Sequence, residues 1–132
     1  MMKVTQISVF LENRPGRLLQ LLQVFADAGV NLQALSVADT ADFGIARAIV
    51  ADVDEAIAAI QAAGLTAATT DVLRVELPDE PGALANRVVQ PLADAGINVG
   101  YVYAYSQRVG DKAVVVLKTD DVDRAVDVLR DL

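Results

Sequence analysis

Cysteine, histidine and tryptophan are all absent from this sequence of 132 residues, and aromatic residues make up only 5% of it. Without cysteine and histidine, the chain cannot form a cysteine nucleophile, a Ser-His-Asp triad or a zinc site with the usual nitrogen and sulfur ligands. No Asp and Glu run has the spacing of a calcium loop, and no phosphate-binding glycine loop is present. We therefore expect no catalytic residues, no metal and no cofactor, and a protein that is not an enzyme.

Basic residues are too few and too scattered to form a nucleic-acid interface. The 11 Lys and Arg residues are dispersed among 18 Asp and Glu residues, which gives a formal net charge of −7. Phosphate backbones require a basic stripe. The chain also lacks a run of 18 apolar residues, and its start, MMKVTQISVF, lacks the basic segment and apolar run of a signal peptide. We expect a soluble, cytoplasmic protein that binds neither nucleic acid nor membrane.

The sequence contains an internal duplication. ENRPGRL at 12–18 corresponds to PDEPGAL at 78–84 with an offset of 66, and ADAGVNL at 26–32 corresponds to ADAGINV at 93–99 with an offset of 67. DEAI at 54–57 then corresponds to DRAV at 123–126 with an offset of 69. Three blocks in the same order indicate two copies, which we assign to residues 1–70 and 71–132.

The offset changes from 66 to 67 inside the first predicted helix of the second copy, which contains Pro91. Proline removes a backbone donor and clashes with the carbonyl one turn earlier. We predict that an extra residue is accommodated there as a bulge beside Pro91.

Hydrophobic periodicity predicts the order β-α-β-β-α-β in the first copy. Alternating apolar residues in Val4–Leu11 and in the equivalent segment around Val75 indicate half-buried strands, and each runs through Pro-Gly into an amphipathic helix. The remaining predictions are a first helix from Pro15 to about Ala28, left-handed helix ends at Gly29 and Gly96, strands at about 31–38, 43–50, 98–106 and 112–118, and second helices capped by Asp52 or Asp54 and by Asp120 or Asp121.

The two copies differ at their ends. The first has room for a fourth strand at about 66–70, whereas the second ends directly after its last helix. We predict that Thr66–Leu77 is one extended stretch, serving as the last strand of the first copy and the first strand of the second. Without a last strand, the sheet of the second copy would have an unpaired edge. We expect this edge to be filled across a domain or subunit interface. We therefore expect a homodimer more than a monomer.

This order specifies an α+β fold of two ferredoxin-like βαββαβ modules in tandem, the second lacking its own last strand. The segments FLENRPGRLLQLLQVFADAGVNLQAL and LPDEPGALANRVVQPLADAGINVGYV resemble the ACT-domain family. The likeness extends more weakly over nearly the whole chain, and two compact modules are similar to the free-standing tandem ACT proteins. The resemblance implies a regulatory protein that binds an amino acid as its small-molecule ligand, and that acts on a partner enzyme of amino-acid metabolism.

In the ACT family, the ligand usually lies between two modules, against the loop from strand one to helix one and the Asn that opens strand two. Free N–H groups at a helix start suit a carboxylate, and an Asn amide or an Asp carboxylate suits an ammonium group. Carried over to this chain, the resemblance implies ligand contacts from Leu11, Asn13, Arg14, Gly16, Arg17, Leu18 and Asn31 in the first copy, and from Leu77, Asp79, Gly82, Ala83, Leu84 and Asn98 in the second.

The two candidate loops differ in charge. Arg14 and Arg17 of the first copy correspond to Glu80 and Ala83 of the second. The first loop is therefore more cationic, and electrostatics favours it for binding a carboxylate. This difference is also compatible with ligand binding by one copy and a purely structural role for the other.

Several features also have a purely structural interpretation. The Pro-Gly pairs are compatible with simple strand-to-helix turns. The two Asn side chains are compatible with a role in hydrogen-bonding backbone groups after a helix end. The two Arg residues are compatible with ordinary surface positions. Tyr101, Tyr103 and Tyr105 alternate along one strand and therefore share one of its faces. This face is compatible with the core, with a subunit interface or with the wall of a ligand site. The alternative functions are a structural or regulatory-subunit interaction module without a ligand and, less favoured, an enzyme.

Overall fold

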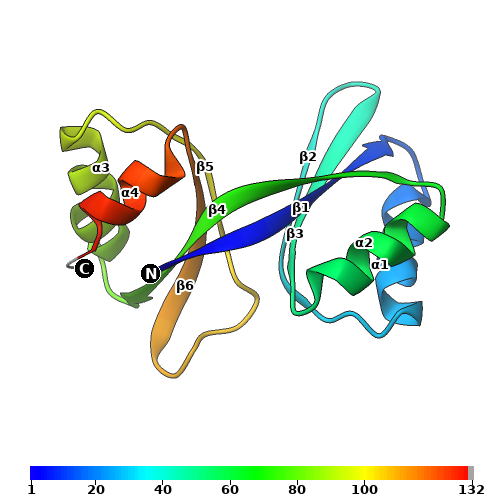
Figure 1. Ribbon diagram of the computed structural model, residues 1–132, viewed down its shortest axis with the longest axis horizontal. Helices are drawn as coiled ribbons and strands as arrows, with labels where there is room; N and C mark the ends of the chain where they lie inside the picture. The colour runs from blue at the N-terminus through cyan, green and yellow to red at the C-terminus, as the bar shows by residue number, and fades with distance from the viewer. Residues whose placement is uncertain (131–132) are drawn as a thin grey trace. The chain divides into compact units, whose positions relative to one another are not determined.

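The computed structural model of the protein describes residues 1–130. Its elements follow the predicted order in the first copy, and the second copy repeats it without a strand after its last helix among the described residues; Figure 1 shows the arrangement within each half of the chain. The α+β fold predicted from the sequence is confirmed. The elements are β1 Met2–Glu12, α1 Arg17–Asp27, β2 Leu32–Asp39, β3 Phe43–Val50, α2 Val53–Ala62, β4 Thr66–Pro78, the π-helix η1 Ala85–Val89, α3 Gln90–Asp94, β5 Val99–Ala104, β6 Lys112–Thr119 and α4 Val122–Val128.

The chain forms two compact units. The first comprises Thr5–Thr70, and the second comprises the chain from Asp71 onward together with Met1–Val4. The strand order is β2-β3-β1-β4-β6-β5. β4 runs without interruption from Thr66 to Pro78, so the extended stretch predicted for Thr66–Leu77 is one strand that serves both units. The first residues of β1 group with the second unit, whereas the sequence placed all of residues 1–70 in the first module.

Each unit has a central antiparallel strand. In the first unit, β3 lies between β1 and β2, with Phe43 opposite Glu12 and Val50 opposite Leu32. In the second unit, β6 lies between β4 and β5, with Lys112 opposite Pro78 and Thr119 opposite Val99. The two units therefore repeat the same strand pairing.

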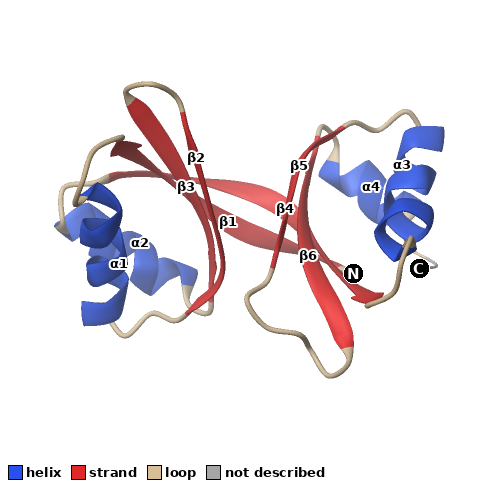
Figure 2. Cartoon of the chain, turned by 180° about the vertical axis from the view of Figure 1, so that it is seen from behind, coloured by secondary structure: helices blue, strands red, loops and turns tan. Residues whose placement is uncertain are grey.

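In the first unit, α1 and α2 cover the same face of the sheet (Figure 2). Leu21 and Phe25 of α1 lie four residues apart, on one side of the helix, and are buried with Ile60 of α2 against the inward side chains of β1 and β3. Fully burying a side chain of this size contributes about 1.5–3 kcal/mol. This core leaves the opposite face of the sheet without helices.

The second unit has the equivalent core. Leu73, Val75 and Leu77 of β4 pack with Val88 and Leu92 of the first helical segment, together with Ala125 of α4 and Leu129 directly after it. Val88 and Leu92 take the places of Leu21 and Phe25, which is an offset of 67. The corner that precedes the helix keeps the offset of 66.

The extra residue is absorbed by the π-helix η1, where the Gln90 N–H donates to the carbonyl oxygen of Ala85, five residues earlier. Pro91 follows immediately, at the start of α3. A wider turn accommodates one more residue and eases the clash of the proline ring with the preceding turn. The bulge predicted beside Pro91 is therefore confirmed.

The predicted helix ends are also found. Gly29 and Gly96 adopt left-handed φ angles of 69° and 73° directly after the first helix of each copy. Asp52 and Asp121 cap the second helices, each accepting a hydrogen bond from a backbone N–H three residues later. None of the helices within residues 1–130 is both long and apolar enough to span a membrane.

Candidate functional site

The two strand-to-helix loops have the same backbone geometry. We call Glu12–Arg17 corner one and the equivalent Pro78–Ala83 corner two. Gly16 and Gly82 adopt left-handed φ angles of 90° and 82°. Each carbonyl accepts a hydrogen bond from the N–H four residues later, from Gln20 at 3.0 Å and from Asn86 at 2.9 Å. The two corners are therefore duplicates in structure as well as in sequence.

Helix α1 starts directly after Gly16, and within the described part of the chain no side chain caps it. The first N–H groups of a helix have no acceptor inside the helix, and the helix dipole places partial positive charge there. The Arg17 N–H donates to the Arg14 carbonyl at 3.4 Å, so the later N–H groups of the first turn are the ones that α1 presents to an external anionic acceptor.

Corner one is hydrogen-bonded to the turn between β2 and β3. The backbone N–H of Asn13 donates to the carbonyl of Asp42 at 2.9 Å. The Asn13 side-chain amide donates to the carbonyl of Thr40 at 3.1 Å, with Asp39 Oδ2 at 3.5 Å. This network holds Asn13 and two acidic side chains at the same end of the sheet.

Two arginines of corner one converge on one carboxylate. Arg14 Nε lies 3.1 Å from Glu12 Oε2, and Arg17 Nε lies 3.8 Å from Glu12 Oε1. The Arg17 Nη1 donates to Gln20 Oε1 at 3.1 Å. Its Nε is buried and has no hydrogen-bond partner among residues 1–130, so its charge is balanced only by the ion pair with Glu12.

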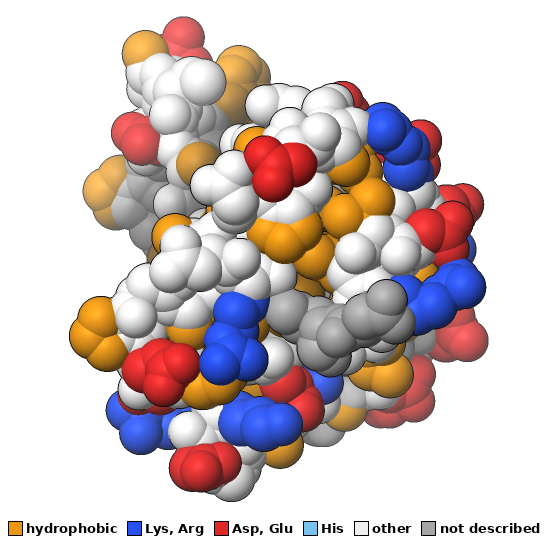
Figure 3. Space-filling model, turned by 90° about the vertical axis from the view of Figure 1, so that its left-hand side faces the viewer, with side chains coloured by type: hydrophobic (Ala, Val, Ile, Leu, Met, Phe, Trp, Pro, Cys, Tyr) orange, Lys and Arg blue, Asp and Glu red, His pale blue; other side chains and the backbone are white. Residues whose placement is uncertain are grey.

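The charges of corner two are also paired. Asp79 forms an ion pair with Arg108 of the loop between β5 and β6, and Glu80 Oε1 lies 3.5 Å from Arg87 Nη2. The contrast between a cationic and an anionic loop is therefore smaller in the structure than in the sequence, because residues outside the loops offset much of it. Positive and negative side chains are also interspersed on the face shown in Figure 3.

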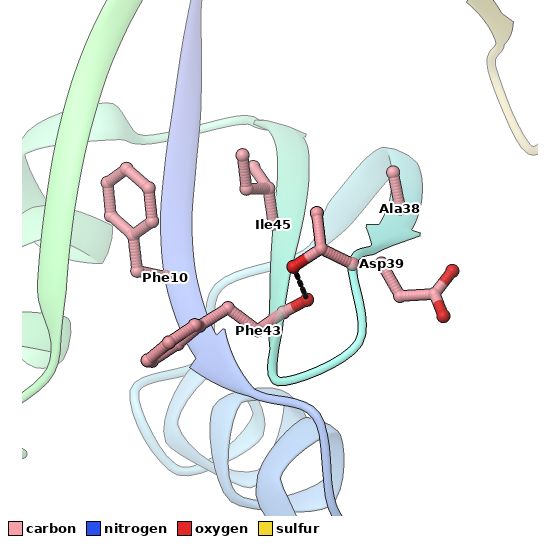
Figure 4. A pocket seen from close by; sticks show the side chains of 6 residues that line it. Phe10, Ala38, Asp39, Phe43 and Ile45 are labelled. Atoms are coloured by element: carbon pink, nitrogen blue, oxygen red, sulfur yellow. Dashed lines mark hydrogen bonds between the residues drawn. The ribbon is translucent and has the colours of Figure 1, made fainter.

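A polar hollow of about 360 Å³ opens at corner one, between Glu12, Asn13 and Arg14 on one side and Ala41, Asp42 and Phe43 on the other. A second hollow of similar volume lies beside it, on the helix-free face of the same unit. It is lined by Phe10, Ala38, Asp39, Thr40, Phe43 and Ile45 (Figure 4). Phe43 is a wall of both hollows.

The residues implied by the resemblance fall into two groups. Asn13, Arg14, Gly16 and Arg17 lie in corner one and Leu18 directly after it, as Asp79, Gly82 and Ala83 lie in corner two and Leu84 directly after it. Leu11, Leu77 and Ala83 are buried, so their side chains support the corners from within the core.

Asn31 and Asn98 lie elsewhere. Asn31 immediately precedes Leu32, which pairs with Val50 at the far end of β3, whereas corner one begins at Glu12, which pairs with Phe43 at its near end. Seven residues of strand separate these ends, about 23 Å. Asn98 bears the same relation to corner two. A single module therefore does not bring its own Asn and corner together.

Sequence reasoning missed the residues of the β2–β3 turn and the outer face of β1. Neither Asp42 nor Phe43 was a predicted site residue; Phe43 was predicted only to begin the strand at about 43–50, and Phe10 only to lie in the strand Val4–Leu11. The available signal was a phenylalanine at an outward position of a half-buried strand.

These observations define the class of protein as a tandem of two ferredoxin-like modules that share a strand and carry duplicated strand-to-helix corners. The ACT domain pair family matches residues 2–131. The chain belongs to this family, as the sequence resemblance implied, and the match supports a regulatory role that depends on ligand binding.

Solved structures extend the comparison. A protein from Bacteroides thetaiotaomicron is 37% identical, with a TM-score of 0.90 over 98% of this chain and 88% of that one. The regulatory subunits of aspartate kinase from Thermus thermophilus, in a ligand-free form, and from Thermus flavus are 16% and 17% identical, with TM-scores of 0.64 and 0.63. Each covers 98% of this chain and 94% of that chain, and at this identity they show a shared fold. No curated protein sequence matches the chain.

Proposed function

We propose that this protein is a non-catalytic regulator that binds a free amino acid through its strand-to-helix corners, at an interface between modules or subunits. The observation that carries the proposal is corner one, where Glu12, Asn13 and Arg14 line a hollow of about 360 Å³ and the loop continues into an uncapped helix start. Binding sites for small molecules typically have volumes of about 300–1,000 Å³.

The chemistry of corner one matches a zwitterion. The N–H groups that start α1, together with Arg14 and Arg17, suit a carboxylate, because donors and positive charge coincide there. The Asp42 carboxylate and the Asn13 amide oxygen suit an ammonium group a few ångströms away. Corner one thus offers complementary groups for both ends of an amino acid's backbone.

The position of the two Asn residues favours an interface. A ligand that contacts both a corner and an Asn at the start of β2 or β5 requires two modules, because one module holds them about 23 Å apart. We therefore propose that a homodimer completes the site. The regulatory aspartate kinase subunits among its structural neighbours support an enzyme of amino-acid metabolism as the regulated partner.

A thermal-shift screen of the twenty amino acids tests the proposal. Affinities between micromolar and millimolar correspond to about −8 to −4 kcal/mol. Ligand at about 100 times its dissociation constant stabilises the folded state by about 2.7 kcal/mol, which raises the Tm of a chain of this size by roughly 10 °C. If none of the twenty amino acids shifts the Tm, the proposal is contradicted.

The duplication supplies a matched control. The double variant Asn13→Asp, Arg14→Glu gives corner one the charges of corner two, and we expect it to remove the shift. The reverse exchange, Asp79→Asn with Glu80→Arg, alters the same number of charges in corner two and should retain it. Equal effects of the two exchanges would argue against corner one as the binding site.

A further inference from the structure

The two adjoining hollows of the first unit have opposite chemistry. The hollow at corner one is lined by Asn13, Arg14, Asp42 and Glu12 side chains. The second hollow is lined almost entirely by apolar atoms, with Phe10, Ile45 and Phe43 among its lining residues and Asp39 and Thr40 also bordering it. Figure 4 shows the Phe10, Ile45 and Phe43 side chains from β1 and β3 around this space. Phe43 borders both hollows, so the two meet at this residue.

The strand register explains why these side chains meet. Phe10 of β1 pairs with Ile45 of β3, which in turn pairs with Ala38 of β2. Paired residues of an antiparallel sheet project from the same face. The three form an apolar row on the helix-free face, and the Glu12–Phe43 pair forms the next row toward corner one. All of these residues belong to the unit Thr5–Thr70.

The two phenylalanines are unusually exposed. Phe10 and Phe43 are 51% and 59% exposed, whereas the remaining phenylalanine of the chain, Phe25, is 1% exposed in the core. The turn holds Phe43 in place, because both the N–H and the Oγ1 of Thr40 donate to its carbonyl, at 2.7 and 3.2 Å. Exposed aromatic side chains grouped around a hollow are typical of a binding site.

We propose that the ligand is an amino acid with a large apolar side chain, branched aliphatic or aromatic. Its side chain occupies the apolar hollow between Phe10, Ile45 and Phe43, while its ammonium and carboxylate occupy the polar hollow at corner one. The inference rests on the proposed function and adds the class of ligand.

The lining of the hollow sets the expected selectivity. An apolar side chain leaves water for an apolar wall, with a gain that grows with the area covered. A charged or amide side chain loses hydration there without gaining a partner. Because the hollow is open on one side, we expect leucine, isoleucine, valine or phenylalanine to bind roughly tenfold more tightly than alanine. Aspartate, lysine and glutamine should bind more weakly than alanine.

Calorimetric titration of the full chain with these amino acids tests the inference. Phe43→Ala and Phe10→Ala remove apolar walls from exposed positions, so we expect the fold to be retained. Either variant should reduce the leucine-to-alanine affinity ratio several-fold while alanine still binds. Leu19→Ala is the matched control, because Leu19 is a 66% exposed apolar residue of α1 outside both hollows, and its ratio should equal that of the wild type.

Each remaining outcome has a definite meaning. Tightest binding of a polar amino acid, or an unchanged affinity ratio in both phenylalanine variants, overturns the inference but leaves the proposed function standing. A change in self-association by light scattering in these variants, without a change in the affinity ratio, also overturns it, because the apolar face then joins two copies of the chain. Failure of every amino acid to bind the wild type contradicts the proposed function itself.

Discussion

Gly16 and Gly82 lie 66 residues apart in the sequence and adopt nearly the same left-handed backbone conformation, with φ angles of 90° and 82°. Side chains with a Cβ rarely adopt these angles, and the left-handed conformation costs them about 1–2 kcal/mol. The duplication therefore conserved a backbone conformation that only glycine adopts without strain, while the charges around it diverged.

We expect Gly16→Ala and Gly82→Ala each to lower the free energy of unfolding by about 1–2 kcal/mol in urea denaturation. The effect of Gly82→Ala should be the larger, because its new Cβ would lie 3.1 Å from Asn86 Nδ2, whereas Gly16 has open space at this position. Gly100→Ala is the control, because the nearest atom to its Cβ would lie at 3.7 Å. Equal losses at Gly16 and Gly100 would show that φ does not determine the cost.

The π-helix predicts a difference between two single-residue deletions. Removal of Arg87 from η1 should convert the wide turn to a regular helix and retain folding, since its ion pair with Glu80 is exposed and such pairs contribute little. Removal of Gln20 from α1 should rotate Leu21 and Phe25 by about 100° out of the core and unfold the chain.

Circular dichroism and urea denaturation of the two deletions provide the measurement. A cooperative transition for the Arg87 deletion, and none for the Gln20 deletion, is the expected result. Unfolding of both would mean that η1 is required by the second unit and does not simply absorb an extra residue.

The caps of α2 and α4 make a separate prediction. Asp52 and Asp121 accept hydrogen bonds from the backbone N–H groups of Glu55 and Arg124, at 3.1 and 3.0 Å. Substitution of either by Ala should cost about 1 kcal/mol of unfolding free energy, whereas substitution by Asn, which also accepts this bond, should cost much less. A comparable loss with Asn would implicate the charge instead of the cap.

Tyr105 predicts a loss of stability at high pH. Burial raises its pKa above the ordinary value of 10.0, and the nearby Arg74 opposes this with a smaller effect. The guanidinium of Arg74 lies 5.2 Å from the centre of the Tyr105 ring. Since the folded state holds the phenol proton more tightly than the unfolded state, this stability is present below about pH 10 and is lost as the pH rises through the folded pKa.

Urea denaturation between about pH 9 and 11 checks the sign of this effect. Tyr105→Phe should weaken the decline in the free energy of unfolding. Arg74→Met should raise the folded pKa further and extend the decline to higher pH, while its onset near the unfolded-state pKa stays the same. A steeper decline in Tyr105→Phe would contradict the account.

The sequence was sufficient for the fold because the duplication doubled each local signal. The period-two segments around Ile7 and Val75 define the strands, and the displaced offset near Pro91 locates the wide turn. The grouping of Met1–Val4 with the second unit was not foreseen, because strand pairing between distant segments depends on three-dimensional packing that periodicity does not encode.

The candidate site was only partly predictable. The corners follow from the Pro-Gly pairs, but the Asp42 carbonyl that accepts from Asn13, and the Phe43 that pairs with Glu12, belong to segments whose approach depends on strand register. Likewise, the Arg108 that offsets Asp79 lies 29 residues away in sequence. Long-range contacts of this kind require the folded sheet.

The central claim is that the start of α1 at corner one binds the carboxylate of an amino acid. Amide chemical shifts in a nuclear magnetic resonance titration with the tightest-binding amino acid report this contact most directly. We predict saturable shifts of the Gly16, Arg17 and Leu18 amides that are lost in Asn13→Asp, Arg14→Glu. Saturable binding that leaves these three amides unchanged would contradict the account.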